Sequence, residues 1–270
     1  MKTQSKHLFL LGLLTFVAII ATGCPHKSEP EPTPATPTIT MKRGVDIQKL
    51  LVGTNLKANS EATSFKASTT PAPQGVPTET LSADGSGIAC VAWLDDATKT
   101  IYYYAKGYTD AGKKIPLTNC VGLFEKCSTL TTIDVSGFDT SKIDRFSSMF
   151  INCTTLTMIV GLDTLNTTNA TTFQGMFNNC SALTEIDISS FDASKVTSTS
   201  DMFNGCTALT TIYAKAGTDW MTISYSANMF KDCTNLKGGA NTTFDSGKPV
   251  DKSYARIDGG TSAPGYFTEK

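Results

Sequence analysis

Apolar residues recur at a fixed long interval in the second half of the chain. Phenylalanine occupies positions 124, 150, 177, 203 and 230, cysteine positions 127, 153, 180, 206 and 233, and leucine positions 130, 156, 183, 209 and 236. The intervals are 26, 27, 26 and 27 residues in all three columns. The shared pattern is Phe-x-x-Cys-x-x-Leu-x-x-Ile, with Met before Phe in the later copies. A constant period of this length predicts a repeat architecture in which each unit buries its apolar face against its neighbours.

Each repeat is expected to contain one short β-strand. Leu130, Ile133 and Val135 have the spacing of the Leu-x-x-Leu-x-Leu strand of leucine-rich repeats. Side chains alternate across a strand, so Ile133 and Val135 face one side and the residues between them face the other. One repeat cannot offset its own loss of chain entropy, which favours stacking of the five copies into a solenoid of parallel strands around one core.

The connection after each strand is predicted to be short and helical or irregular. Polar residues of N-cap type, such as Asp139-Thr140-Ser141, follow a turn at Ser136-Gly137. Apolar residues then recur at helical spacing, which predicts a short helical segment. The inward-facing residues of the first such segment are expected to be Ile143, Phe146, Met149 and Phe150.

The five repeats, residues 121–237, need covered ends. An uncovered end would expose apolar side chains and a strand edge. Two β-rich runs, Ile88–Leu94 and Thr100–Ala105, flank a polar turn and predict a hairpin. We expect residues 88–120 to form an N-terminal cap around this hairpin. Residues 238–270, with Tyr254, Ile257, Tyr266 and Phe267, are expected to form the C-terminal cap.

The first residues have the pattern of an export signal. Lys2 and Lys6 precede an apolar run of 13 residues, Leu8–Ile20, which is the length of a signal-peptide core and too short for a comfortable membrane span. Small residues then lead to Cys24, as in the lipobox of bacterial lipoproteins. We therefore expect residues 1–23 to be a signal peptide and Cys24 to carry the lipid. Plain secretion, with Cys24 incidental, is the alternative.

The segment between Cys24 and the repeats is poor in apolar residues. Residues 24–44 hold five prolines among polar residues, which predicts an extended tether between the lipid and the body. Residues 45–87 are expected to be mostly linker, with a possible short helix over Val45–Gly53. Membrane attachment through two or more acyl chains would be durable.

Seven cysteines follow Cys24. Export favours disulfides, but neighbouring strands lie about 4.8 Å apart, whereas a disulfide needs Cβ atoms about 3.8 Å apart. The repeat cysteines are therefore interpreted as small buried apolar residues. A bond between Cys90 and Cys120, or between Cys120 and Cys127, stays open.

The outward side of the strands is the first candidate for a binding face. Its two columns are expected to be Thr132, Met158, Glu185 and Thr211, and Asp134, Val160, Asp187 and Tyr213. Met158, Val160 and Tyr213 suggest an apolar patch, and large contiguous patches mark interaction sites. Scattered exposed side chains, or contacts covered by a cap, are the alternative.

Composition argues against catalysis. The only histidines, His7 and His26, precede the expected body, so a histidine-based triad or zinc site is not expected there. No phosphate or dinucleotide motif is present, and we expect no cofactor and no metal. Without residues 1–23 the chain has 21 basic and 24 acidic residues, which does not favour nucleic acid. Carboxylates at shared repeat positions, Asp134 with Asp187 and Asp139 with Asp192, are interpreted as strand-face and cap residues rather than as a glycosidase pair or a calcium site.

The repeat resembles that of the BspA-like leucine-rich-repeat surface proteins of bacteria. The matching segments are Phe124–Ser141 and Met176–Ser194, while the second repeat departs at Val160-Gly161 and the last two lose the pattern early. The resemblance implies a right-handed solenoid at the cell envelope, on the outer-membrane surface or extracellular face, that binds host matrix proteins, host cells or other bacteria. A structural or polysaccharide-associated envelope lipoprotein without a host ligand is the alternative.

Overall fold

The computed structural model describes residues 42, 46, 50, 61–82, 88–117 and 119–270. All of them lie in one compact unit, residues 37–270. The expected signal peptide, Cys24 and nearly all of the tether lie outside the described residues. Asp46 and Leu50 are helical, and the rest of the possible short helix also lies outside. The strands are β1 (Ser64–Ala67), β2 (Glu79–Thr80), β3 (Cys90–Asp95), β4 (Thr100–Ala105), β5 (Ile115–Pro116), β6 (Thr132–Asp134), β7 (Phe138–Asp139), β8 (Met158–Val160), β9 (Glu185–Asp187), β10 (Thr211–Ala214) and β11 (Phe267–Glu269).

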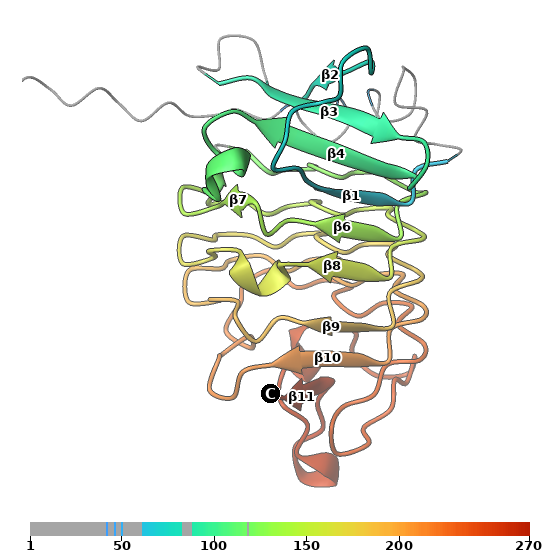
Figure 1. Cartoon of the computed structure of the whole chain (residues 1–270). Coiled ribbons are helices and arrows are strands. Elements are labelled where there is room, and N and C mark those ends of the chain that lie inside the picture. Colours follow the sequence, from blue (N-terminus) through green and yellow to red (C-terminus); the bar gives the residue numbers. More distant parts are fainter. Residues whose placement is uncertain (1–41, 43–45, 47–49, 51–60, 83–87, 118) are drawn as a thin grey trace, which may run out of the picture. The chain divides into compact units, whose positions relative to one another are not determined.

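Short parallel strands of successive repeats lie side by side in register (Figure 1). One sheet has the order β2-β3-β4-β1-β6-β8 and another the order β11-β10-β9, while β5 and β7 form a small third sheet. Thr132 pairs with Met158, and Glu185 pairs with Thr211. Residues that are equivalent in the sequence repeat are therefore neighbours in space. The described chain also has four 3-10 turns: η1 (Thr109–Ala111), η2 (Leu162–Thr164), η3 (Lys252–Tyr254) and η4 (Gly260–Ser262).

The repeat phenylalanines form a continuous stack in the core. Consecutive ring centroids, from Phe124 to Phe230, are 5.6, 5.6, 5.6 and 6.0 Å apart, and consecutive rings are within 8° of parallel. All five rings are fully buried. Since the three middle rings contact the rings of both adjacent repeats, and each end ring contacts one, the core is shared between repeats rather than divided among them.

The repeat cysteines link each repeat to the one before it. The thiol of Cys153 donates to the carbonyl oxygen of Phe124 at 3.0 Å, and the thiol of Cys180 donates to that of Phe150 at 3.2 Å. Cys206 and Cys233 repeat this contact. A small side chain with a weak donor is therefore needed at this position. The seven cysteines of the described residues, Cys90 and Cys120 included, are buried and free.

Burial should make these thiols unreactive in the folded protein. It raises the pKa of Cys90, Cys153 and Cys206 to about 12, and the thiolate is the reactive species. We expect no alkylation of the seven cysteines in native protein at a pH of about 8, and alkylation of all seven after denaturation. Peptide mass spectrometry after labelling distinguishes them from Cys24. Rapid native labelling of any of the seven, or a disulfide between two of them, would contradict this expectation.

The connections between the strands are turns rather than helices. The four inward-facing residues expected of the first connection, Ile143, Phe146, Met149 and Phe150, are buried as expected. However, a left-handed φ recurs at two positions of every repeat, two residues before Phe and directly before Cys, and such residues interrupt a right-handed helix. Most of them are the residue types that tolerate this conformation. They are Gly122, Lys126, Ser148, Asn152, Gly175, Asn179, Asp201, Gly205, Asn228 and Asp232.

The interval 45–87, expected to be mostly linker, contains two strands that the sequence did not predict, β1 and β2. β1 pairs in parallel with β4 on one side and with β6 on the other, so it separates the hairpin from the first repeat strand. The hairpin of β3 and β4 is present and antiparallel. Phe65 of β1 meets Phe124 edge-on at 5.1 Å. β1 thus covers the first end of the phenylalanine stack, a role that the sequence analysis assigned to the hairpin.

The C-terminal segment covers the other end of the stack. β11 pairs in parallel with β10, placing Phe267 opposite Ile212. Phe267 and Tyr266 are buried and meet Phe230 edge-on, at 5.9 and 5.3 Å. Tyr254 stacks on Tyr266 at 4.7 Å. Both ends of the stack are therefore closed by edge-on aromatic contacts instead of another parallel ring.

Candidate functional site

The eight residues of the expected binding face lie on the outward side of their strands. None is buried, whereas Ile133, Ile186 and Ile212, which lie between them, are buried, and Ile159 of β8 is half-buried. Met158 is 56% exposed and Val160 is 40% exposed, which is unusual for large apolar side chains in this molecule. Thr132 and Asp134 share a sheet with these two residues, and the other four belong to the sheet of β9 and β10: Glu185, Asp187, Thr211 and Tyr213.

The same outward face continues past the repeats onto β1, β4 and β3. Phe65 pairs with Ile133, and the next residue of β1, Lys66, is exposed and pairs with Tyr102 of β4. Tyr102 pairs in turn with Trp93 of β3, and their rings stack with centroids 5.7 Å apart. The Lys66 ammonium lies 5.2 Å from the centre of the Tyr102 ring. Trp93 is buried, at 5% exposure, so the exposed face extends beyond the repeat region only as far as β4.

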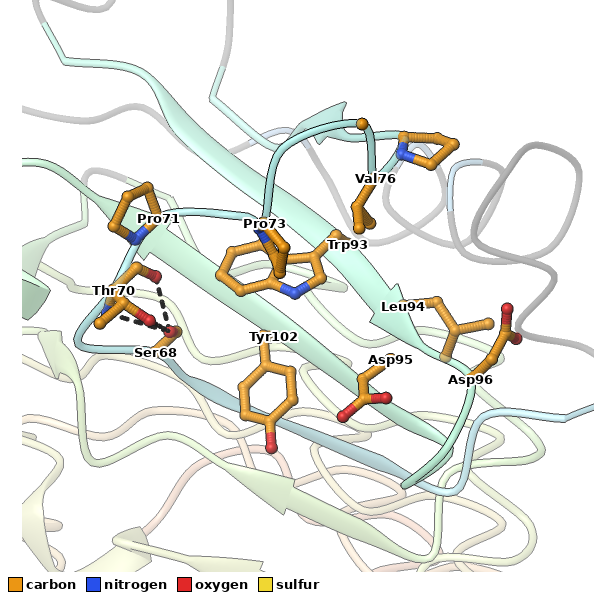
Figure 2. Close-up of a pocket in the computed structure, with 12 residues that line it drawn as sticks. Ser68, Thr70, Pro71, Pro73, Val76, Trp93, Leu94, Asp95, Asp96 and Tyr102 are labelled. Carbon is orange, nitrogen blue, oxygen red and sulfur yellow. Dashed lines mark hydrogen bonds between the residues drawn. The ribbon is translucent and has the colours of Figure 1, made fainter.

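A cleft of about 800 Å³ lies at this far end of the face. Its floor includes Trp93 and Tyr102, and its other wall is the proline-rich segment 70–77, which arches over them (Figure 2). Pro73 lies across the indole of Trp93 in this view. Asp95 and Asp96 stand at the end of β3, beside the mouth of the cleft.

The segment 70–77 is held mainly at its base. Ser68 accepts a hydrogen bond from the Thr70 N–H at 3.1 Å and donates its hydroxyl to the Thr70 carbonyl at 2.7 Å. Farther along, the Val76 N–H donates to the Pro73 carbonyl within the same segment. Most of its residues are exposed. The segment thus leaves a hollow beneath it instead of packing flat on the sheet.

A second hollow, of about 410 Å³, separates β8 from β9. No strand pairing joins these two neighbours, although the opposite side of the same repeats stays connected through the Phe150 N–H and the Met176 carbonyl at 2.9 Å. The interruption coincides with the extra residue of the second repeat. Gly161 follows β8 with φ +76°, and an added Cβ would lie 2.6 Å from the Ser136 backbone. The 3-10 turn η2 begins directly after Gly161 and directs the chain away from the direction of β8.

Lys270 closes one side of the hollow between β8 and β9. Its ammonium forms an ion pair with Asp187 and lies 5.8 Å from the centre of the Tyr213 ring. Partial burial acts to raise the pKa of Asp187, but hydrogen bonds from Lys270 and Ser189 outweigh it and hold the pKa below its usual value. Tyr213 is therefore partly covered by the C-terminal residue, and the exposed apolar patch reduces to Met158 and Val160.

The carboxylates at shared repeat positions stabilise turns. Asp134 accepts from the Ser136 N–H at 2.8 Å, and Asp187 accepts from the Ser189 N–H at 2.9 Å. The Asp139 and Asp192 carboxylates make the same contact with the N–H two residues later. This is the geometry of an Asx turn. These four carboxylates therefore have a structural role in turns. The sequence had suggested that they are strand-face and cap residues.

Lys66, Tyr102 and the buried Trp93 are the residues on this side of the sheet that sequence reasoning missed. Trp93 and Tyr102 were recognised as hairpin residues, and their pairing across the turn was a signal that they share a face. For Lys66 the signal was weak, because β1 has one large apolar residue in a Ser- and Thr-rich stretch. Within the described residues, no cluster of three or more His, Cys, Asp or Glu has a metal-binding arrangement. The described helices include none that is long and apolar enough to cross a membrane.

The comparisons with known proteins give one match. Residues 118–243, which span the repeats, match a family described as Mycoplasma protein of unknown function, DUF285. No curated protein matches the chain, and no solved structure matches it. The repeat region is therefore similar to a family that has no assigned function.

Proposed function

We propose that this protein is a non-catalytic binding module of the bacterial cell envelope, held through a lipid on Cys24. We further propose that its repeats form a leucine-rich-repeat-like solenoid of the BspA type. The in-register parallel strands and the stack of repeat phenylalanines support this architecture. The tether would place the body away from the membrane surface. Its ligands would be molecules of the host matrix, of host cells or of other bacteria.

The continuous outward face from β8 to β4 is the observation that carries the proposal. It combines two exposed apolar side chains, Met158 and Val160, with charged and aromatic neighbours. Interaction sites on proteins commonly combine an apolar patch with a polar surround. The carboxylates that would suggest catalysis are occupied in turns. The face therefore offers a surface for recognition more readily than a reaction centre.

Placing charge on the apolar patch should weaken binding strongly. The full chain, displayed on lipid vesicles, is tested for saturable attachment to immobilised matrix proteins and to host cells. The double variant Met158→Glu with Val160→Glu should weaken attachment about tenfold or more, because interfaces exclude unpaired charge from their centre. The matched control is Met221→Glu with Tyr225→Glu, since these side chains are also exposed apolar residues but lie outside the face.

Two outcomes would count against the proposal. One is the absence of saturable attachment by the wild-type chain to any matrix protein or cell. The other is equal attachment by the face variant and the control variant. Protease accessibility on intact cells would separately show whether the body faces outward. An inward-facing body would favour a structural envelope role instead.

A further inference from the structure

We propose that the hollow between β8 and β9 binds an extended segment of a partner protein, with basic side chains on its outer side and an apolar side chain on its inner side. This inference rests on the proposed function, because it names the chemistry of a partner for part of the same face. β8 ends one sheet and β9 ends another, and the hollow of about 410 Å³ lies between them. Figure 1 shows the two strands as neighbours on the same side of the repeats. An added strand would join the two sheets.

The middle residue of β8 directs its backbone groups toward the hollow. The Met158 N–H donates to the Thr131 carbonyl at 3.1 Å, on the side of β6. The Val160 carbonyl accepts from the Val135 N–H at 2.9 Å, on the same side. Successive residues of a strand direct their N–H and C=O groups to opposite neighbours, so those of Ile159 face β9. Within the described part of the chain, these two groups of Ile159 have no backbone partner.

The facing edge of β9 is open in the same way. Ile188, directly after β9, donates its N–H to the Tyr213 carbonyl at 2.9 Å and therefore faces β10. By the same alternation, the N–H and C=O groups of Glu185 and Asp187 face away from β10, toward the hollow. Donors and acceptors thus alternate along both edges. A free strand edge is a template for an extended peptide, and main-chain hydrogen bonds supply the affinity.

The inner lining of the hollow favours an apolar side chain on the partner. Side chains of an inserted strand would alternate between the inner and outer sides of the sheet. On the inner side the lining residues Leu162, Leu183 and Ile186 are buried, and Ile159 is half-buried. A valine or isoleucine of the partner would lie between the two isoleucines and remove apolar surface from water.

The charges of the hollow favour basic side chains on the outer side of the partner. Three carboxylates line it, from Asp163, Glu185 and Asp187, against the single ammonium of Lys270. Lys270 pairs with Asp187, whereas Glu185 is exposed and has no ion pair within the described residues. A lysine beside Glu185 would form a cross-strand ion pair, and an acidic residue there would be repelled. The aliphatic part of the same lysine would cover Met158 on β8.

A short labelled peptide tests the inference. The probe is the capped pentapeptide Thr-Lys-Val-Lys-Thr with a fluorophore, and its binding is measured to the full chain displayed on neutral phosphatidylcholine vesicles. One comparison peptide, Thr-Glu-Val-Glu-Thr, reverses the charge. The other has the sequence of the probe with N-methylated backbone amides, so it keeps the charge but cannot donate to a strand edge. We expect saturable binding of the probe and binding about tenfold weaker or less for both comparison peptides.

A charge reversal on β9 locates the binding. Glu185→Lys should weaken binding of the probe about tenfold and strengthen binding of Thr-Glu-Val-Glu-Thr, because it replaces attraction with repulsion and the reverse. The matched control is Asp96→Lys, which makes the same change at an exposed residue outside the hollow. The side chain of Glu185 is exposed, so the variant should keep the circular dichroism spectrum and melting temperature of the wild type.

Hydrogen exchange measures the backbone contacts directly, without any substitution. The bound probe should slow exchange of the Ile159, Glu185 and Asp187 amides, whose N–H groups face the hollow, and the N-methylated peptide should not. Slow exchange of these amides before the probe is added would overturn the inference. It would show that a second copy or another segment of the chain already fills the hollow.

Three further results would overturn the inference: no binding of the probe, equal binding of its N-methylated form, or equal binding of the probe by Glu185→Lys and Asp96→Lys. The vesicle attachment assay separates this inference from the proposed function. Attachment to matrix proteins or cells that depends on Met158 and Val160 but is unchanged by Glu185→Lys would remove only this inference. The absence of any saturable attachment by the wild-type chain would remove the proposed function.

Discussion

Replacing Phe177 with alanine should lower the free energy of unfolding by about 3–5 kcal/mol. Phe177 is the middle ring of the stack, 5.6 Å from Phe150 and 5.6 Å from Phe203, and it is fully buried. Its removal takes a large side chain out of the core and leaves a cavity between adjacent repeats. Backbone hydrogen bonds, such as that from the Phe150 N–H to the Met176 carbonyl, hold these repeats in place. The surrounding repeats have little freedom to collapse into this space, which places the cost at the upper part of the range. Urea denaturation followed by circular dichroism measures it.

Met158→Ala provides the control for this prediction. Met158 is an apolar residue of the same repeat region, but it is more than half exposed, so its truncation should change stability by about 0.5 kcal/mol or less. A loss below about 1 kcal/mol for Phe177→Ala would contradict a core shared between adjacent repeats. It would mean that each repeat can close around its own apolar residues.

Replacing Asp258 with alanine should cost about 3 kcal/mol or more. The carboxylate is 7% exposed and organises the C-terminal segment by accepting hydrogen bonds from several groups at once. It accepts from the N–H groups of Ala240 and Thr242 at 2.9 and 2.8 Å, from the Thr242 hydroxyl at 2.6 Å, and from the Gly260 N–H at 2.9 Å. Alanine would leave these donors without an acceptor. Urea denaturation of the variant at neutral pH measures the loss.

The cost of Asp258→Ala should depend on pH in a defined direction. Burial acts to raise the pKa of Asp258, but the hydrogen bonds from Thr242, Gly260 and Ala240 outweigh it, so the pKa is below the ordinary value of 3.8. A carboxylate with a lowered pKa stabilises the fold above the ordinary value, and its contribution disappears as the pH falls through the pKa of the folded state. The difference between wild type and variant should therefore be constant near neutrality and shrink below pH 3.8. A difference that grows on acidification would contradict the assigned role.

Asp258→Asn separates the charge from the shape of the side chain. The amide retains one acceptor oxygen but places donors where N–H groups of the chain already point, so we expect a loss between those of wild type and alanine. The loss should be almost independent of pH. Because the C-terminal segment covers the end of the phenylalanine stack through Tyr266 and Phe267, the variant should also increase hydrogen exchange in β10 and β11.

The sequence by itself determined which residues are inside. Large apolar residues recur at one interval, and their burial is favourable at about 1.5–3 kcal/mol each, so the columns of Phe, Cys, Leu and Ile had to face a common core. The outward columns followed from the alternation of side chains along a strand. Both inferences depend only on local spacing, which the sequence records directly. For this reason the register of Thr132 against Met158, and of Glu185 against Thr211, agrees with the expected columns.

Only the tertiary structure decided the backbone path between these residues and the outline of the site. A short helix and a series of turns would bury the same side chains, so the spacing alone does not distinguish them. The left-handed backbone conformation of Asn152 and Asn179 shows that the connections are turns. β1 is stabilised by partners far away in the chain, as when the Thr131 N–H donates to the Thr63 carbonyl, so its short, polar sequence had little local signal. The hollow between β8 and β9 and the cleft above Trp93 depend on the same kind of long-range placement. The local spacing of apolar residues specifies which side chains are buried, whereas hydrogen bonds between distant segments specify where clefts form on the surface.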